Sequence, residues 1–144
     1  MEGRDISLIT YGALMVERAL KAAEALRLLH ISAEVLDLQT IVPMDKKAIL
    51  ESVTKTGHAL IIHEAKTNFG VGAEIARIVS EEMLDIKKYC GQQLAVPMYV
   101  KVLGAKEGPV AAHPALEVLR MPQVDDIVDA AKGYKKLKRI RAEG

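Results

Sequence analysis

The residues best suited to chemistry lie together in one stretch, "HEAKTNFGVG", residues 63–72. His63 and Glu64 follow a short apolar run directly, and both side chains can transfer protons. Gly70 and Gly72 precede a helical pattern, and the backbone amides at the start of a helix can bind an anion. Proton transfer and anion binding are therefore the two chemistries that this stretch has to be tested against.

The spacing of these residues argues against both a proton-transfer site and a dinucleotide-binding loop. Neighbouring strand residues point to opposite faces, so His63 and Glu64 cannot act on one substrate atom without a bend. The dinucleotide pattern requires a third glycine where this chain has Ile75. Close packing at the helix start is the favoured use of Gly70 and Gly72, with an anion at the amides of residues 71–73 as the alternative. We predict no catalytic or cofactor-binding residues, and we take His63, Glu64, Gly70 and Gly72 as crevice or subunit-contact residues.

Metal binding is not expected from the remaining candidates. His30, His58 and His113 have no ligand spacing with one another or with Cys90. A single cysteine cannot form an internal disulfide, which favours a reducing, cytoplasmic setting.

Length and composition favour one globular domain over residues 1–144. Half of the 144 residues are apolar, enough for a sizeable core. No apolar stretch approaches the ~20 residues of a membrane span. A net charge of +1 and only 3% aromatic residues give no reason to expect nucleic-acid binding. The run "KKLKRIR", 135–141, is typical of a helix C-terminus and is a candidate docking patch at most.

Hydrophobic periodicity predicts alternating strands and helices. Strands are expected at 5–12, 32–40, 58–63 and 98–103, and helices at 13–29, 45–57, 71–84 and 125–141. Asp45 suits the N-cap of the second helix, and Gly57 suits the position after its end. Residues 85–97 are expected to be mostly loop, and 104–122 irregular with at most a short helical turn from 115 to 119.

This alternation predicts an α/β fold, a three-layer sandwich with a mainly parallel sheet and helices on both faces. We predict the strand order 2-1-3-4, with the fourth strand near an edge. The loops 11–14 and 64–71 then flank the crevice at which such sheets usually bind ligands.

Three segments carry a family resemblance: "DISLITYGALMVERALKAAEAL", "SAEVLDLQTIVPMDKKAILESVTKTGHALIIHEA" and "FGVGAEIARIVSEE". They resemble consecutive segments of the C-terminal, transketolase-like domain in the beta subunit of thiamine-diphosphate-dependent 2-oxo acid dehydrogenases. The resemblance runs from Asp5 to Glu82 and continues more weakly over 102–131. It implies a mixed five-stranded sheet with one antiparallel edge strand. The chain departs from the family at Gln39, where Arg is usual, and at Lys106, where an acid is common.

The resemblance also implies a function. It implies an assembly and docking domain of a pyruvate or branched-chain 2-oxo acid dehydrogenase, inactive alone, that works with an alpha subunit, a dihydrolipoyl acyltransferase core and further beta chains. Thiamine diphosphate with Mg is implied for the full enzyme and not for this domain alone. The alternatives are a stand-alone anion or small-ligand binding module and the C-terminal domain of another transketolase-type enzyme.

The family's chains are longer, so an excised domain or a truncated protein is expected. The family's antiparallel edge strand comes from residues just before Glu2. We therefore expect strand 32–38 to be an unprotected edge that acquires partners.

Overall fold

The computed structural model describes the backbone of residues 1–90, 99–108 and 113–142, and side chains for 1–82, 99–108, 113 and 115–135. The elements follow one another in the order β1 (Ile6–Thr10), α1 (Ala13–Leu28), β2 (Ala33–Asp37), α2 (Lys46–Thr56), β3 (His58–Lys66), α3 (Val71–Cys90), β4 (Tyr99–Ala105), α4 (Pro114–Arg120) and α5 (Val124–Ala142).

The four described strands form one sheet in the order β2-β1-β3-β4, and every neighbouring pair is parallel. Leu8 on β1 lies opposite Val35 on one side and Leu60 on the other. The predicted strand order is therefore confirmed, and β4 lies at an edge as expected.

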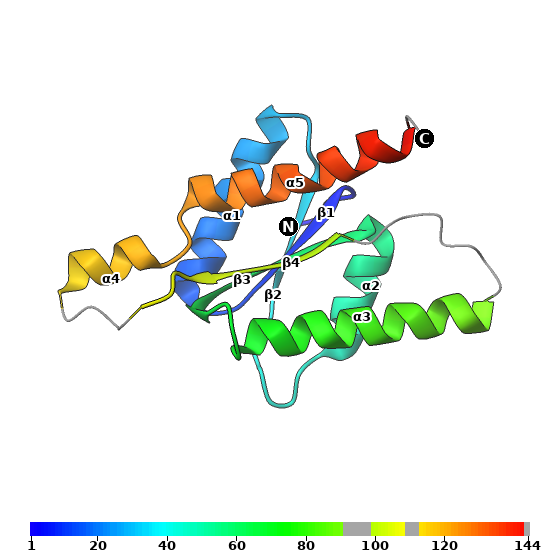
Figure 1. Ribbon diagram of the computed structural model, residues 1–144, viewed down its shortest axis with the longest axis horizontal. Coiled ribbons are helices and arrows are strands. Elements are labelled where there is room, and N and C mark those ends of the chain that lie inside the picture. The colour runs from blue at the N-terminus through cyan, green and yellow to red at the C-terminus, as the bar shows by residue number, and fades with distance from the viewer. Residues whose placement is uncertain (91–98, 109–112, 143–144) are drawn as a thin grey trace.

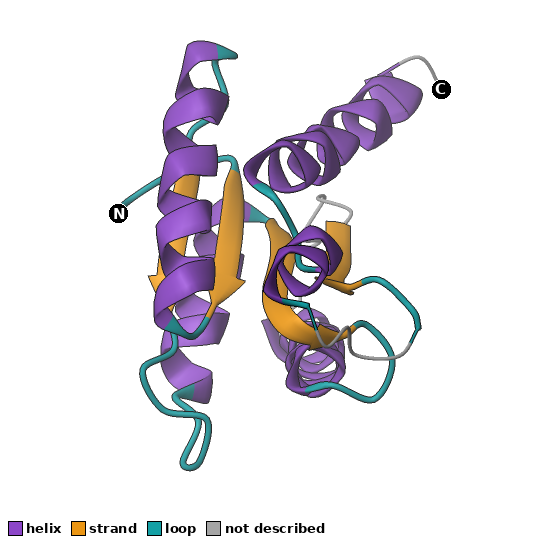
Figure 2. Ribbon diagram, turned by 90° about the vertical axis from the view of Figure 1, so that its left-hand side faces the viewer, coloured by secondary structure: helices purple, strands orange, loops and turns teal. Residues whose placement is uncertain are grey.

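Helices cover both faces of this sheet (Figure 1). One core packs strand residues such as Ile6 and Leu60 against α1 and α5. The other core packs Ile9 and Ile61 against α2 and α3. Because consecutive strand residues alternate between the two cores, an almost entirely apolar strand is required, and each buried aliphatic side chain contributes about 1.5–3 kcal/mol. Figure 2 shows the twisted strands between the helices, and the three-layer α/β prediction is confirmed.

The ends of α2 follow the predicted cap residues. The Asp45 carboxylate accepts a hydrogen bond from the Ala48 amide at 3.0 Å. Gly57 follows the last turn with φ 75°, a left-handed conformation that glycine adopts without a Cβ penalty. Both predictions are confirmed, and these caps fix where the chain enters β3.

Two predictions for the second half of the chain need correction. The expected loop at 85–97 is wrong for 85–90, which continue α3 to Cys90, while 91–97 lie outside the described residues. The expected short turn at 115–119 is a helix of 7 residues, α4, because Pro114 suits the first helical turn and the His113 ring caps the Ala115 amide.

The outer edge of β2 is partly covered. Val35 donates its amide to the Met1 carbonyl at 2.9 Å, and the Met1 amine lies 3.4 Å from the Val35 carbonyl. At Gly3 an added Cβ would meet the Ala33 carbonyl carbon at 2.2 Å, so only glycine allows this approach. The expectation of an unprotected edge is therefore wrong for this portion, because residues 1–3 run antiparallel along the strand and satisfy its backbone groups.

Candidate functional site

The carboxyl edge of the sheet places His63 and Glu64 on opposite faces of β3. Ile61, two residues before His63, belongs to the core shared with α2 and α3, whereas Ile62 belongs to the core shared with α1 and α5. His63 accordingly meets Gly72 of α3. Glu64 instead reaches the start of α1, where its Oε1 lies 3.8 Å from the position of a Cβ on Gly12. The two proton-transfer groups are thus separated by the strand, as the alternation of strand side chains requires.

His63 is fully buried, with an exposed fraction of 0%. Its Nδ1 lies 3.3 Å from the hydroxyl of Tyr11, which follows β1. Its Nε2 has no hydrogen-bond partner among the described residues. Burial lowers the pKa of His63 below its ordinary value, because the charged ring would lose its hydration. Burial therefore favours the neutral ring and keeps it away from the molecular surface.

Three glycines make room for this ring. An added Cβ would meet the His63 ring at 2.6 Å from Gly70, 2.7 Å from Gly72 and 3.0 Å from Gly104. Gly72 would in addition meet Val102 at 2.8 Å. The glycines that follow β3 thus serve close packing on a buried imidazole, which is the use that the sequence favoured.

Glu64 lines a cavity of about 150 Å³ between the ends of β3 and β4 and helix α4. Lys66, Glu117 and Arg120 also line it. Arg120 is occupied, since it donates hydrogen bonds to the carbonyls of Lys106 and Gly108. The cavity is small and is bounded by both charges, so its chemistry selects no single ligand class.

Tyr11 is the member of this edge that sequence reasoning missed. Burial, followed by the nearby Glu64 carboxylate, raises the pKa of the Tyr11 phenol. It also lines a more open cavity of about 410 Å³ beside the end of β2, which includes Asp37 and Gln39. The signal available in the sequence was its place, directly between the first strand and Gly12.

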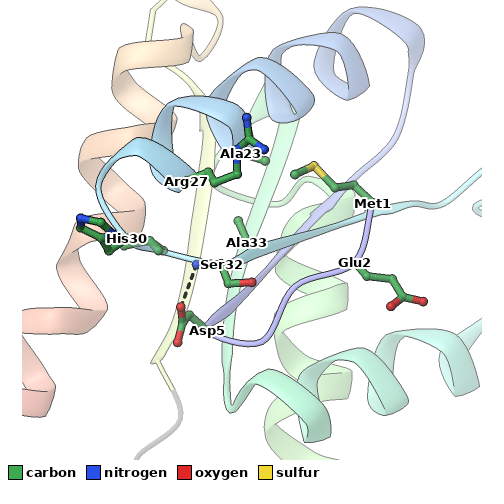
Figure 3. A pocket seen from close by; sticks show the side chains of 9 residues that line it. Met1, Glu2, Asp5, Ala23, Arg27, His30, Ser32 and Ala33 are labelled. Atoms are coloured by element: carbon green, nitrogen blue, oxygen red, sulfur yellow. Dashed lines mark hydrogen bonds between the residues drawn. The ribbon is translucent and has the colours of Figure 1, made fainter.

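A third cavity, of about 230 Å³, lies at the opposite edge of the sheet and is shown in Figure 3. Its rim includes Arg27 from the last turn of α1, His30 from the turn that follows, and Glu2 from the N-terminal segment. The Asp5 carboxylate on this rim accepts a hydrogen bond from the Ser32 amide at 2.7 Å. This pocket therefore lies far from the crevice predicted at the carboxyl edge.

The described residues at the carboxyl edge offer no fit to a diphosphate or its metal ion. Among the described residues no three His, Cys, Asp or Glu side chains gather in a way that could hold a metal. At the start of α3 the Ala73 amide donates to the Gly70 carbonyl at 2.9 Å, and the glycines pack on His63. No step of a cofactor reaction is therefore assigned to these side chains.

Exposed apolar side chains lie on the loop after β3 and on α4, which borders the ends of β3 and β4. Phe69, between β3 and α3, is fully exposed and has φ 62°. On α4, which projects from the body in Figure 1, Leu116 is 55% and Leu119 62% exposed. No helix in the described part of the chain is long and apolar enough to cross a membrane. Such surfaces are typical of contacts with other polypeptides.

Comparison with known proteins gives the class to which this fold belongs. The family model described as transketolase, C-terminal domain, matches residues 1–127. The chain therefore belongs to the transketolase C-terminal domain family, as the resemblance implied.

Two relatives with known names are similar to the chain over most of its length. The chain is 38% identical over 132 residues to the pyruvate dehydrogenase E1 component subunit beta of Staphylococcus aureus, covering 91% of this chain and 37% of that protein. It is 35% identical over 131 residues to the acetoin:2,6-dichlorophenolindophenol oxidoreductase subunit beta of Cupriavidus necator, covering 91% and 36%.

A solved structure supports the same assignment. A split gene transketolase, described as an inactive beta4 tetramer, matches with a TM-score of 0.74 and 26% identity, covering 95% of this chain and 41% of that one. The chain thus spans little more than a third of the length of the curated relatives it matches.

Proposed function

We propose that the chain acts as the C-terminal assembly and docking domain of the beta subunit in a 2-oxo acid dehydrogenase of the pyruvate or branched-chain type. The observation that carries this proposal is the extent of the similarity. It covers 91% of this chain but only 37% of the pyruvate dehydrogenase subunit from Staphylococcus aureus. The packing of His63 also supports the proposal, because the buried ring offers no reactive group to a substrate.

The partners follow from the same proposal. An alpha subunit, a second beta chain and an acyltransferase core are the partners we assign to the longer protein. The exposed Leu116 and Leu119 give α4 an apolar surface for such a contact. The beta4 assembly named for the split gene transketolase favours a second beta chain among the partners. Thiamine diphosphate and Mg are assigned to the remainder of the enzyme, where they would supply carbanion stabilisation.

The stand-alone anion-binding alternative gains no support from the described geometry. Gly70 and Gly72 face the His63 ring. The Glu64 carboxylate already lies beside Gly12 at the start of α1, where an anion would otherwise be favoured.

A domain exchange tests the proposal. Residues 1–144 replace the matching C-terminal portion of the Staphylococcus aureus beta subunit, and the chimera is co-expressed with the alpha subunit of the same enzyme. We expect a stable complex in light-scattering chromatography and measurable decarboxylation of pyruvate. A beta subunit cut off before the exchanged portion serves as the control and should form no such complex. A chimera that unfolds cooperatively yet binds no alpha subunit would contradict the proposal.

A further inference from the structure

His63 is a titratable side chain that no charged group among the described residues faces. From β1 the titratable group beside it is the Tyr11 hydroxyl. On β3 the adjacent Glu64 points to the other face, toward Gly12. The other described neighbours of the ring are Gly70, just before α3, Gly72 on α3 and Gly104 on β4, which carry no titratable side chain.

Only one ring nitrogen of His63 can be satisfied in this setting. In either tautomer Nδ1 pairs with the Tyr11 hydroxyl at 3.3 Å, while Nε2 has no partner among the described residues. A protonated ring would donate from both nitrogens. The second N–H would then point at the backbone of Gly72 and Gly104, where it is enclosed without an acceptor in the described part of the chain. A buried charge with an unpaired donor is strongly unfavourable, so protonation requires that one wall of the enclosure moves.

The walls around the ring differ in strength. β1 and β4 are held by parallel pairing with β3. The latch loop, which we define as residues 67–72, is held by fewer described bonds outside α3. The Gly104 amide donates to the Thr67 hydroxyl at 3.2 Å, the Asn68 side-chain amide donates to the Glu107 carboxylate at 3.0 Å, and the Ala73 amide donates to the Gly70 carbonyl. Segments with few backbone bonds open at lower free energy than core strands.

We propose that His63 is a proton-controlled latch: the neutral imidazole holds the latch loop against the sheet, and protonation releases it. The loop carries Phe69, which is fully exposed with a positive φ. Release therefore changes the apolar surface that the carboxyl edge presents. The latch acts through the fold itself, so it stands whether or not the chain assembles with other subunits.

The test is a titration of the purified 144-residue protein between mildly alkaline and mildly acidic pH. Nitrogen NMR of the histidine rings follows the protonation of His63. Hydrogen exchange, expressed as protection factors so that intrinsic pH effects cancel, follows the amides of the latch loop and, as an internal reference, those of β1. Between about pH 6.5, where a histidine in an open chain titrates, and the midpoint of the His63 titration, we expect loop protection to fall by up to about tenfold per pH unit. The β1 amides, which open only on global unfolding, should keep much higher protection factors than the loop at every pH.

Variants separate the latch from general acid sensitivity. His63→Asn should abolish the pH dependence of loop protection. Tyr11→Phe should move the release to higher pH, because the neutral enclosed ring loses its only hydrogen-bond partner among the described residues. His30→Asn, at an exposed position with φ 55° that Asn tolerates, should leave the release unchanged. If His63→Asn does not fold, the wild type and Tyr11→Phe suffice. Loop protection that ignores the His63 titration, or that equals the protection of β1 at every pH, would overturn the proposal.

Discussion

The hydroxyl oxygens of Ser7 on β1 and Ser52 on α2 lie 2.7 Å apart inside the protein, and Thr56 lies 2.8 Å from Ser7 on its other side. The Thr56 hydroxyl also lies 3.0 Å from the His58 carbonyl, to which it can donate. A buried polar network of this kind fixes the position of α2 on the sheet, provided that its members stay paired.

Replacing Ser7 by Ala should destabilise the fold by about 1–3 kcal/mol, because Ser52 and Thr56 each lose a buried partner. Urea unfolding followed by circular dichroism measures the change. Ser80→Ala, an exposed hydroxyl that bonds only to its own helix at the Ala76 carbonyl, should change stability by less than about 0.5 kcal/mol. Equal effects of the two substitutions would contradict the role of the network.

Replacing Gly72 by Ala should destabilise by about 1–3 kcal/mol despite the better helix propensity of Ala, because the new methyl meets His63 and Val102 at under 3 Å. In a His63→Ala background the same change should lose most of that penalty. A double-mutant cycle from denaturant unfolding measures this coupling. The control Ala73→Gly, at the exposed neighbouring position, should destabilise by only about 0.5–1 kcal/mol. If Gly72→Ala costs the same with and without the His63 ring, the penalty does not come from packing against His63.

Stability should fall in mild acid. The folded pKa of His63 lies below its unfolded value, so its neutral form contributes fully above about pH 6.5. As the pH drops below that value the unfolded chain binds the proton first. The free energy of unfolding should then decrease by up to about 1.4 kcal/mol per pH unit until the folded pKa is reached. Urea unfolding at stepped pH measures this slope, which His63→Asn should flatten and His30→Asn should preserve.

Assembly should depend on α4 more than on other exposed leucines. Leu119→Glu should weaken self-association by at least about tenfold, since a charge in an apolar contact must be desolvated. Leu28→Glu is the matched control, because Leu28 is exposed on α1 and lies outside α4. Analytical ultracentrifugation of the chimeric beta subunit would show the difference, and identical dissociation constants for the two variants would remove α4 from the contact.

Periodicity was sufficient to predict the layers and the strand order, because an apolar strand buried on both faces leaves little freedom in a parallel sheet. Residue type does not decide burial along α1, where Leu20 is 39% exposed and Arg18 is buried. Arg18 donates to the Pro122 carbonyl, 104 residues away, at 2.8 Å. The sequence around Arg18 could not predict a hydrogen bond to so distant a segment.

The candidate residues lie at the carboxyl edge of the sheet, but the enclosure of His63 was not predictable from the residue types. A histidine at the end of an apolar run can either emerge into solvent or stay enclosed. His63 stays enclosed because Gly70, Gly72 and Gly104 have no side chains that would displace the ring. Gly104 comes from a different strand, β4. Only the folded sheet brings these three positions onto one ring.

The reciprocal backbone contacts of Met1 and Val35 have a practical consequence for reporter placement. Arg4 donates to the Ser32 carbonyl and Met1 pairs with Val35, so the N-terminal segment runs opposite to β2. Any affinity tag or fluorophore joined ahead of Met1 is consequently aimed past Asp37, toward the end of the molecule that displays Phe69. A fluorophore that should report on the end with Phe69 can be joined ahead of Met1. A purification tag that must not contact that end needs a flexible spacer.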